Sequence, residues 1–490
     1  MELDTSRPIE TMPGSAATPG AKKLKLGQIA GPVHFIGIGG IGMSALALLL
    51  LAEGVKVSGS DKAGSPITDE LKSLGAEIYI GHKAENLGKA EAVVVSTAIT
   101  TSNPELARAL ELELPVFHRS EVLAYIGENK KTIAVSGTHG KTTTTGMISQ
   151  LLMDDGRDPS VVVGGIFAYM KSNAHAGKGE FFVAEADESD RTHATLPSEV
   201  AVVTNIEPDH LENYPGGMEQ ILATMASFAN KAKNCVLLCT DDAGCRELAP
   251  RLTSRIVSYG EKSVSADADY QLELEDDGGF KVYRHKNLLG SVHMTVPGKH
   301  NKMNGLASLA VCMELGTSFE QAAKSLESFR GVARRFEHIG ESHNILVIDD
   351  YAHHPTEVRA TLEAAQQFRK TSGRSGRIVA AFQPHQPGRL RDLWDEFCQS
   401  FNNADLVLLA DVYVARGGQI EGINSEAFCQ KVQHQNAHYI PGPTADLPAK
   451  IKAMIKPGDI VLTIGAGDIT NVGKPLLALI SDEGFDGTNC

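Results

Sequence analysis

Short apolar runs bounded by turn residues alternate with longer apolar-periodic stretches in the first third of the chain. Residues 33–38 have the pattern of a buried strand, a Gly-rich turn follows, and an Ala/Leu-rich helix continues to about residue 53. Further strands are predicted at residues 55–58, 77–80 and 92–96. Strands that alternate with helices in this way indicate a parallel α/β sheet.

The same alternation continues through two further segments. In the first of them the pattern predicts strands at 132–135, 180–185 and 200–204, with helices at 141–153 and near 218–231. In the second, strands are predicted at 345–348, 377–382, 406–409 and 460–464, with helical patterns between them. No sequence repeat relates the three segments.

Chain length agrees with this division, because 490 residues at roughly 150 residues per domain predict about three domains. The first 30 residues are rich in Pro, Gly, Ser, Thr and Ala, and we predict a disordered extension there. The boundaries of the three α/β domains are predicted at residues 31–127, 128–335 and 336–490.

Composition and charge argue against some classes of function. The chain is 42% hydrophobic with a formal net charge of −14, which argues against a general binder of nucleic acid or of membrane surfaces. The apolar run at residues 46–51 is too short to span a bilayer, and no secretory signal precedes it, so we expect a cytoplasmic protein without membrane insertion. The seven cysteines are scattered without a CxxC pair, which predicts free thiols.

Residues 137–145, GTHGKTTTT, lie between a predicted strand and a predicted helix, the context of a phosphate-binding loop. Glycines let backbone N–H groups turn toward phosphate oxygens, and the helix N-terminus adds partial positive charge. Lys141 supplies a full charge near the β and γ phosphates of ATP, and the Thr142 hydroxyl suits Mg²⁺. The full Walker pattern has a glycine where this chain has Val135, so a plain strand-to-helix turn is the structural alternative.

A second glycine-rich turn, residues 37–42, matches GxGxxG, and Asp61 ends the next strand. The pattern says that a diphosphate can approach the backbone and that Asp61 can meet a ribose or a base edge. NAD, FAD and a UDP-sugar all satisfy that description.

Acids and histidines follow several of the predicted strands. The strand that ends near Glu185 runs into four acids, and the next ends at TNIEPDH, with Asn205 and His210. The carboxyl ends of parallel strands line the ligand crevice, and hard oxygen ligands there suit Mg²⁺. Each cluster alone can be a solvated loop or a helix cap, but two of them beside a phosphate loop favour catalysis.

The polar clusters further along the chain allow more than one interpretation. His300 and Asn304 lie four residues apart on one helical face, which fits either an adenine contact or a capped helix start. In the last segment the polar stretches 349–355 and 382–389 each follow a strand, which predicts a binding surface.

Taken together, the ordered motifs resemble those of the Mur ligases of peptidoglycan synthesis, in particular the branch that adds L-alanine. These motifs are GIGGIGMS, SGSD, GTHGKTTTT, AEADESD, TNIEPDH, GKHNKMN, RRFE, DDYAHHPTEV, FQPH and GAGD, and they extend from about Val33 to Asp468. The resemblance implies an N-terminal Rossmann-like UDP-binding domain, a central P-loop-type ATPase domain and a C-terminal Rossmann-like domain that binds the amino acid.

The resemblance also implies a reaction. ATP converts the lactyl carboxylate of UDP-N-acetylmuramate into an acyl phosphate, and the amine of L-alanine then attacks it, giving an amide, ADP and phosphate. Mg²⁺ is the expected cofactor, and ATP, UDP-N-acetylmuramate and L-alanine are the expected partners. We expect a monomer or a homodimer.

Residue roles follow from the matching motif positions. The expected UDP-sugar contacts are Gly37, Gly39, Gly40, Gly42 and Asp61. The expected ATP contacts are Gly137, Thr138, His139, Gly140, Lys141, Thr142, Thr143, His300, Asn304 and Asp350. The expected catalytic residues are Lys141, Glu185, Asn205, His210 and Arg335, with Thr142, Glu185 and His210 as the metal ligands. The expected contacts to the amino acid are Tyr351, His353, His385 and Arg389.

Two departures and three alternatives accompany these roles. Gln386 and Pro387 stand where the family has an arginine, often followed by a tyrosine, and Arg416 is a possible compensating charge. A murein-tripeptide recycling ligase typically has a tyrosine and a longer insertion after the acidic strand, where this chain has Ser189 and a short run to Val200. An NAD-dependent oxidoreductase leaves GTHGKTTTT unexplained. The intact Lys141, Glu185 and His210 argue against a non-catalytic nucleotide-binding regulator.

Overall fold

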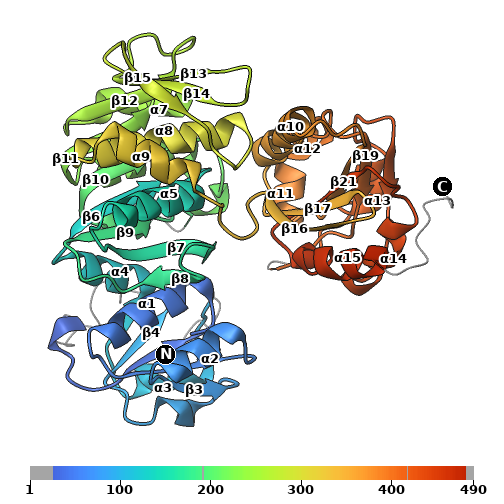
Figure 1. Ribbon diagram of the computed structural model, residues 1–490. Coiled ribbons are helices and arrows are strands. Elements are labelled where there is room, and N and C mark those ends of the chain that lie inside the picture. Colours follow the sequence, from blue (N-terminus) through green and yellow to red (C-terminus); the bar gives the residue numbers. More distant parts are fainter. Residues whose placement is uncertain (1–25, 190–191, 416–417, 482–490) are drawn as a thin grey trace. The chain divides into compact units, whose positions relative to one another are not determined.

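The computed structural model describes residues 26–189, 192–415 and 418–481 (Figure 1). Two compact units divide these residues. The first extends to Glu273 and includes Lys281–Ser291 and Asn304–Leu326, and the second contains Leu274–Phe280, Val292–Met303 and the chain from Glu327 onward. The predicted boundaries at residues 127 and 335 remain predictions.

A five-stranded parallel sheet in the order β3-β2-β1-β4-β5 begins the first unit. Its strands are β1 (Val33–Ile36), β2 (Val57–Asp61), β3 (Glu77–Ile80), β4 (Ala92–Val95) and β5 (Val116–His118). Its helices are α1 (Ile41–Ala52), α2 (Pro66–Ser73), α3 (Pro104–Glu111) and α4 (Arg119–Gly127). Apolar side chains of β1 and β4, such as Ile36 and Val93, pack with Leu106 of α3 in one core.

A ten-stranded sheet follows in the order β15-β14-β13-β12-β11-β10-β6-β9-β7-β8. Its strands are β6 (Lys131–Ser136), β7 (Ser160–Phe167), β8 (Ser172–His175), β9 (Phe181–Glu185), β10 (Ser198–Val203), β11 (Ala232–Cys239), β12 (Ile256–Glu261), β13 (Tyr270–Leu274), β14 (Phe280–Arg284) and β15 (Asn287–Val292). Its helices are α5 (Lys141–Asp154), α6 (Gly217–Ala229), α7 (Ala243–Leu248), α8 (Lys299–Glu314) and α9 (Phe319–Glu327). The central strands β9, β6 and β10 are parallel, so their carboxyl ends lie at one edge of the sheet.

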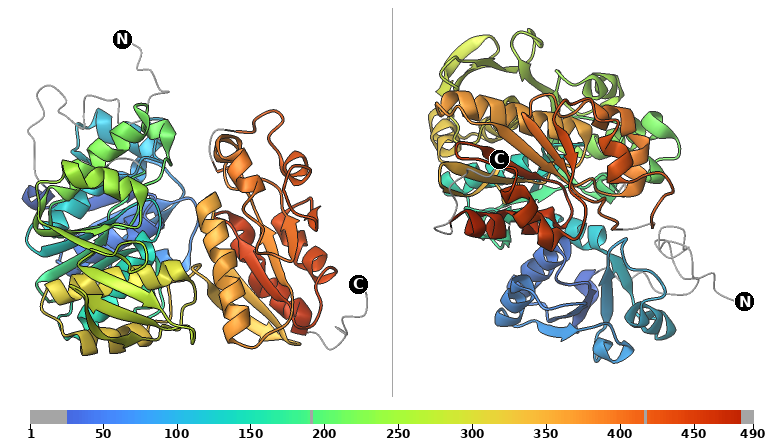
Figure 2. Two further views of the ribbon diagram at one scale, coloured as in Figure 1. Left: turned by 90° about the horizontal axis from the view of Figure 1, so that it is seen from above. Right: turned by 90° about the vertical axis from the view of Figure 1, so that its right-hand side faces the viewer.

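The second unit contains a six-stranded sheet in the order β16-β17-β21-β18-β19-β20. Its strands are β16 (Glu337–Ser342), β17 (Ile345–Asp350), β18 (Ile378–Phe382), β19 (Leu406–Leu409), β20 (Ala437–Tyr439) and β21 (Ile460–Ile464). Its helices are α10 (Pro355–Thr371), α11 (Pro387–Asp392), α12 (Trp394–Cys398), α13 (Ser425–Cys429), α14 (Leu447–Lys452) and α15 (Gly473–Ser481). Two apolar cores, one shared with α10 and α12 and one with α14 and α15, cover opposite faces of this sheet (Figures 1 and 2).

These three sheets confirm the predicted α/β class. Every predicted strand is present, three of them with the predicted ends and the others with ends shifted by up to three residues. The strand predicted at 55–58 is β2, which begins two residues later. The pattern missed ten of the described strands: β5, β7, β8, β11, β12, β13, β14, β15, β16 and β20. Among these, β8 and β16 pair antiparallel with a neighbour and are only partly apolar. Residues 26–28 form a helical turn with Leu26 buried, whereas we predicted disorder to residue 30, and the rest of that extension lies outside the described residues.

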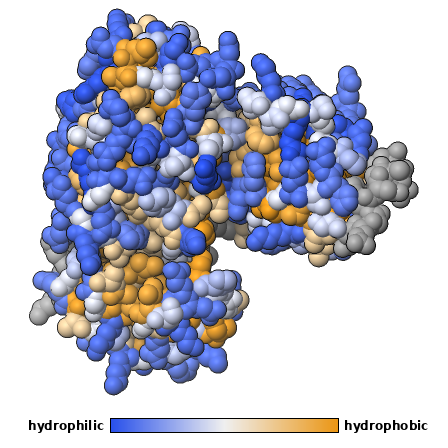
Figure 3. Space-filling view, viewed as in Figure 1, coloured by the Kyte–Doolittle hydropathy of each residue, from blue (hydrophilic) through white to orange (hydrophobic). Residues whose placement is uncertain are grey.

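Polar side chains cover most of the visible surface, with apolar side chains gathered in separate patches (Figure 3). Within the part of the chain that the structure describes, no helix is both long enough and apolar enough to cross a bilayer. The six described cysteines are free thiols, as predicted, and Cys490 lies outside the described residues.

A buried polar network ties α3 to the first sheet. The Glu105 carboxylate accepts hydrogen bonds from the Ser60 hydroxyl at 2.5 Å and the Asn86 amide at 2.6 Å, and the His34 ring lies 3.7 Å away. Burial alone would raise the pKa of Glu105, but the nearby His34 ring and the hydrogen bonds from Ser60 and Asn86 outweigh it and lower the pKa from its ordinary 4.5 to about 2. The ionised carboxylate is therefore the form that the fold requires.

Replacing this carboxylate tests that requirement. A pKa lower in the folded than in the unfolded state stabilises the fold above pH 4.5, and the stabilisation is lost as the pH falls toward 2. Glu105→Gln is expected to lower the free energy of unfolding by about 3 kcal/mol at pH 7 and by less than half of that at pH 3. Thermal unfolding by circular dichroism at both pH values measures the difference from wild type, and a difference independent of pH would contradict the assignment.

Candidate functional site

The loop between β6 and α5 has the backbone that a phosphate requires. Gly137 and Gly140 have φ values of 129° and 84°, a region that residues with a Cβ rarely occupy. A Cβ on Gly137 would lie 2.3 Å from Thr204 Oγ1 and 2.9 Å from the Asn205 carbonyl oxygen. A Cβ on Gly140 would lie 2.7 Å from Asn304 Oδ1. Both glycines are therefore required by close neighbours as well as by conformation.

Residues that follow β10 hold the loop in place. The Asn205 side chain accepts a hydrogen bond from the His139 amide at 2.8 Å and donates one to the His139 carbonyl at 3.0 Å. Thr138 receives a hydrogen bond on its hydroxyl from the Glu207 amide at 2.8 Å. Both polar atoms of the Asn205 amide are thus engaged with the loop backbone, which is a positioning contact for the loop itself.

Lys141, the first residue of α5, is largely buried and contacts the loop backbone. Its ammonium group donates to the Gly137 carbonyl at 2.6 Å and to the Thr138 carbonyl at 3.1 Å, and it pairs with Glu188 at 2.8 Å. Burial alone would lower the pKa of Lys141, but Glu188, Asp187 and Glu185 outweigh it and raise the pKa. Burial raises the pKa of Glu188 to about 7 despite the nearby lysine. Lys141 is therefore a fixed positive charge inside an acidic pocket.

Glu185 ends β9 and is held by the neighbouring strand. The Gly164 amide of β7 donates to Glu185 Oε2 at 2.9 Å, and a Cβ on Gly164 would lie 2.5 Å from the same oxygen. Thr142, in the first turn of α5, is buried. A carboxylate and a hydroxyl are donors that suit a hard divalent cation such as Mg²⁺, so these residues fit the predicted metal.

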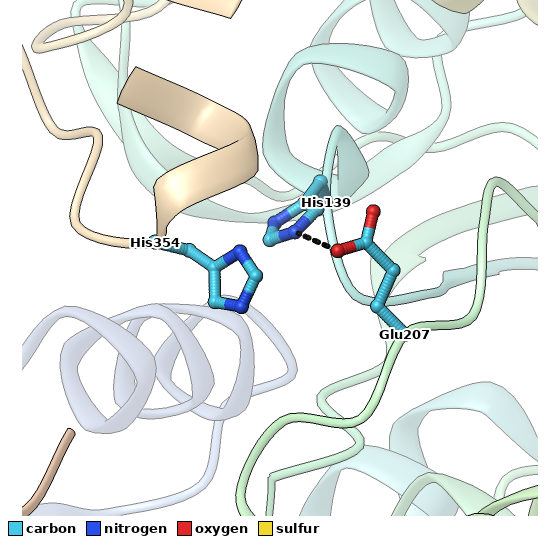
Figure 4. Close-up of side chains that lie close together, drawn as sticks. All are labelled: His139, Glu207 and His354. Atoms are coloured by element: carbon cyan, nitrogen blue, oxygen red, sulfur yellow. Dashed lines mark ion pairs between the residues drawn. The ribbon is translucent and has the colours of Figure 1, made fainter. Parts of the chain in front are cut away.

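Histidines flank the loop. His139 lies 3.7 Å from the Glu207 carboxylate, an ion pair if the ring is protonated (Figure 4). His210 has φ of 54°, and its ring lies 3.6 Å from Asp209. Among the described residues, the groups of three imidazole or carboxylate donors within 4.8 Å of one another include neither Glu185 nor His210. Their role as metal ligands therefore stays a prediction.

The GxGxxG turn and Asp61 lie together, as the sequence predicts. Gly37 has φ of 78°, Gly40 caps α1, and the Gly39 amide donates to Asp61 Oδ2 at 2.9 Å. Asp61 therefore fixes the turn from β2. The N-terminus of α1 is also tied to the central sheet, because Asn173 of β8 donates to the Ile41 carbonyl at 2.5 Å.

The first unit contains a pocket that is partly open to solvent. It is lined by residues of the GxGxxG helix, of α4 and of the acidic strand end, among them Gly42, Arg119, Glu185, Asp187 and His193. An ion pair of 3.0 Å joins Arg119 and Asp187. The predicted UDP-sugar loop and the predicted metal-binding acids therefore border one space.

In the second unit, Asp350 is buried at the end of β17. Its carboxylate accepts hydrogen bonds from the amides of Phe336 at 2.8 Å and Ala352 at 2.9 Å and from the Thr361 hydroxyl at 3.0 Å. Burial raises the pKa of Asp350 to about 6 against the charge of Arg335. These bonds give Asp350 a structural role, and a nucleotide contact stays a prediction.

The predicted acceptor residues form a row of rings in the same unit. The guanidinium of Arg335 lies 5.0 Å from the Tyr351 ring centre, and Tyr351 and His353 are 5.1 Å apart. His353 and His385 are 6.0 Å apart, and His385 stacks on Tyr413 at 5.6 Å. The structure thus brings Tyr351, His353 and His385 together.

The remaining predicted residues around the acceptor amino acid are described by their position in the chain and their backbone conformation. Arg389 lies in α11, shortly after His385 in the sequence. Gln386, which replaces the family arginine, has φ of 71°. His300 is exposed near the start of α8, and Arg416 lies outside the described residues.

Several residues with direct contacts to the site were not among the predicted site residues, and four of them are instructive. They are Arg119, Gly164, Glu188 and Tyr413. Gly164 leaves one signal, because a Gly pair interrupts an apolar strand at 164–165, and such a glycine marks a close approach. Arg119 leaves none, because nothing local distinguishes it from other exposed arginines.

The glycine geometry makes a prediction about the loop. Gly137→Ala is expected to weaken ATP binding by about tenfold or more, because the added methyl displaces the loop amides that we predict to face the phosphates. Gly156→Ala is the matched control, since Gly156 also has positive φ, 72°, but its Cβ would meet nothing within 4 Å. Isothermal titration calorimetry measures both, and equal losses in the two variants would show that backbone strain alone is responsible.

Three family models match the chain in order. The model described as "Mur ligase family, catalytic domain" matches residues 32–131, "Mur ligase middle domain" matches 135–312, and "Mur ligase, glutamate ligase domain" matches 334–467. Together they cover more than half of the chain.

Individual relatives agree with these matches. The chain is 43% identical over 453 residues to the UDP-N-acetylmuramate--L-alanine ligase of Geobacter sp. (strain M21), covering 91% of this chain and 96% of the relative. The structure of the UDP-N-acetylmuramate-alanine ligase of Thermotoga maritima has a TM-score of 0.78 at 29% identity and covers 91% of this chain and 98% of that chain. A murein peptide ligase of Psychrobacter arcticus has a TM-score of 0.68 at 23% identity, covers 92% and 99%, and so shows the fold alone. With three models matched in order and a relative 43% identical across nine-tenths of its length, the chain belongs to the Mur ligase family.

Proposed function

We propose that this chain is an ATP-dependent ligase that joins L-alanine to the lactyl carboxylate of UDP-N-acetylmuramate. The observation that carries the proposal is the phosphate loop with buried Lys141 beside the acids of β9. The relative that is 43% identical, which bears the name of this activity, supports the choice of substrates. A cytoplasmic location remains our prediction, and so does a monomeric or homodimeric state.

The chemistry has two steps. One oxygen of the carboxylate attacks the γ phosphorus of ATP, the bond from that phosphorus to the β-phosphate oxygen breaks, and ADP leaves. The amine nitrogen of L-alanine then attacks the carbonyl carbon of the acyl phosphate, phosphate leaves, and the nitrogen loses a proton. Activation is necessary because a free carboxylate is a poor electrophile.

Residues of the first unit suit the first step. Lys141 offers a positive charge to the β and γ phosphates, and its present partners are two carbonyls and a carboxylate that phosphate oxygens can replace. Thr142, Glu185 and His210 are the residues that we assign to Mg²⁺. When bound there, Mg²⁺ supplies charge neutralisation where phosphate meets carboxylate.

Residues of the second unit suit the amino acid. The row formed by Tyr351, His353 and His385 offers imidazole and phenol groups to the small zwitterion, and Arg389 offers a positive charge for its carboxylate. Gln386 lacks the charge that the family usually has there, so we assign the carboxylate contact to Arg389. We also propose the domain limits 31–127, 128–335 and 336–490 for the three roles.

Phosphate release tests the reaction directly. With ATP, Mg²⁺ and UDP-N-acetylmuramate present, L-alanine is expected to trigger phosphate release, and Lys141→Ala is expected to abolish it, because the loop loses its only full charge. Circular dichroism checks that the variant is folded. Release with the tripeptide L-alanyl-γ-D-glutamyl-meso-diaminopimelate but not with alanine would transfer the assignment to a recycling ligase.

The contact between Gly164 and Glu185 tests the metal assignment. Gly164→Ala places a methyl against the Glu185 carboxylate and is expected to raise the Mg²⁺ concentration for half-maximal activity by about tenfold. Gly156→Ala should leave that concentration unchanged. Titrating Mg²⁺ at saturating substrates measures the effect, and an unchanged requirement in Gly164→Ala would remove Glu185 from the proposed ligands.

A further inference from the structure

We propose that Arg119 receives the lactyl carboxylate of the UDP-sugar and that Asp187 holds the same guanidinium until the substrate arrives. This inference rests on the proposed function and deepens it. Arg119 would be a substrate-binding residue, and Asp187 a positioning residue that acts through Arg119.

The position of Arg119 follows from the first unit. Arg119 is the first residue of α4, directly after β5, and its side chain is a quarter exposed. Its Nη2 lies 3.0 Å from Asp187 Oδ2, and its Nη1 lies 3.4 Å from where a Cβ on Gly42 would be. The guanidinium therefore lies between the GxGxxG helix and the acidic end of β9.

Charge makes this position significant. The residues that line the pocket include two acids, Glu185 and Asp187, so a substrate carboxylate that enters meets repulsion. Among the described lining residues, Arg119 alone carries a permanent positive charge. A guanidinium matches a carboxylate with two parallel N–H donors, which is a geometry that a lysine cannot provide.

Asp187 has the properties of an exchangeable partner. Its Oδ2 atom accepts a hydrogen bond from Arg119 Nη2 at 3.0 Å, and its side chain is about a third exposed. Asp187 also accepts a hydrogen bond from the Ser189 amide at 3.0 Å, so it keeps a partner when Arg119 turns away. Exchange of one carboxylate for another leaves the charge balance at Arg119 unchanged.

Exchange also brings the substrate to the place where it reacts. Asp187 belongs to the group of acids around Lys141, the residue that we assign to the γ phosphate. A carboxylate that replaces Asp187 at Arg119 lies beside Glu185, at the edge of the proposed metal site. Each oxygen then accepts one N–H from Arg119 and keeps a lone pair, so one of them can attack the γ phosphorus.

The experiment compares two ligands that differ in the carboxylate. UDP-N-acetylglucosamine has the same nucleotide and sugar as UDP-N-acetylmuramate but lacks the lactyl group. Arg119→Ala is expected to weaken binding of UDP-N-acetylmuramate by about 10- to 100-fold and binding of UDP-N-acetylglucosamine by less than about twofold. Arg119→Lys should recover part of the loss, and Arg108→Ala, an exposed arginine of α3, is the control.

Asp187→Asn is expected to have the opposite effect on binding, because it removes the carboxylate that pairs with the Arg119 guanidinium. UDP-N-acetylmuramate should then bind several-fold more tightly, with no change for UDP-N-acetylglucosamine. In turnover, Arg119→Ala should raise KM for the UDP-sugar and leave KM for ATP within about twofold. Isothermal titration calorimetry and phosphate release supply these values.

The possible outcomes distinguish a failure of the proposed role of Arg119 from a failure of the proposed function. Equal weakening of both ligands by Arg119→Ala, or no weakening of either, would overturn the role of Arg119 while a wild type active with alanine keeps the proposed function. A wild type that neither binds UDP-N-acetylmuramate nor releases phosphate with alanine would overturn the proposed function itself.

Discussion

A buried ammonium group held between backbone carbonyls and carboxylates is the interaction on which the rest of the site depends. Lys141 loses its hydration in the fold, and the acids around it offset that loss. Those acids are in turn tolerated only because Lys141 and Arg119 are close to them. The cluster is therefore interdependent: removing the lysine leaves the buried Glu188 without its ion-pair partner, and removing an acid weakens the hold on the lysine.

Parallel strands bring the members of this cluster together. β6, β9 and β10 lie side by side, and each ends at the same edge of the sheet. β6 leads into the phosphate loop, β9 into the acids, and β10 into Asn205, which fixes the loop by two hydrogen bonds. Side chains more than sixty residues apart in sequence are thereby held within hydrogen-bonding distance by backbone pairing alone.

Local sequence was sufficient for the parts of the site that depend on backbone conformation. The glycines at 137 and 140, the helix that starts at Lys141 and the turn that meets Asp61 follow from motif and strand order, and the structure has them there. Arg119 and Gly164 could not be predicted, because their importance comes from neighbours distant in sequence, Asp187 and Glu185. Asp350 is a different case: the nucleotide contact that its motif predicts stays a prediction, and its carboxylate also accepts three internal hydrogen bonds that no sequence pattern predicts.

The hairpin of β7 and β8 contacts both ends of the first unit's site. Asn173 of β8 holds the first turn of α1, and Gly164 of β7 holds Glu185. The hairpin thus links the α1 turn to Glu185, and coupling between ligands at these two places would run through it. Such coupling is reciprocal by thermodynamic necessity. If a cation at Glu185 changes the affinity for a ligand at the α1 turn by some factor, that ligand changes the affinity for the cation by the same factor. The order in which the two ligands bind then depends on their concentrations as well as on the structure.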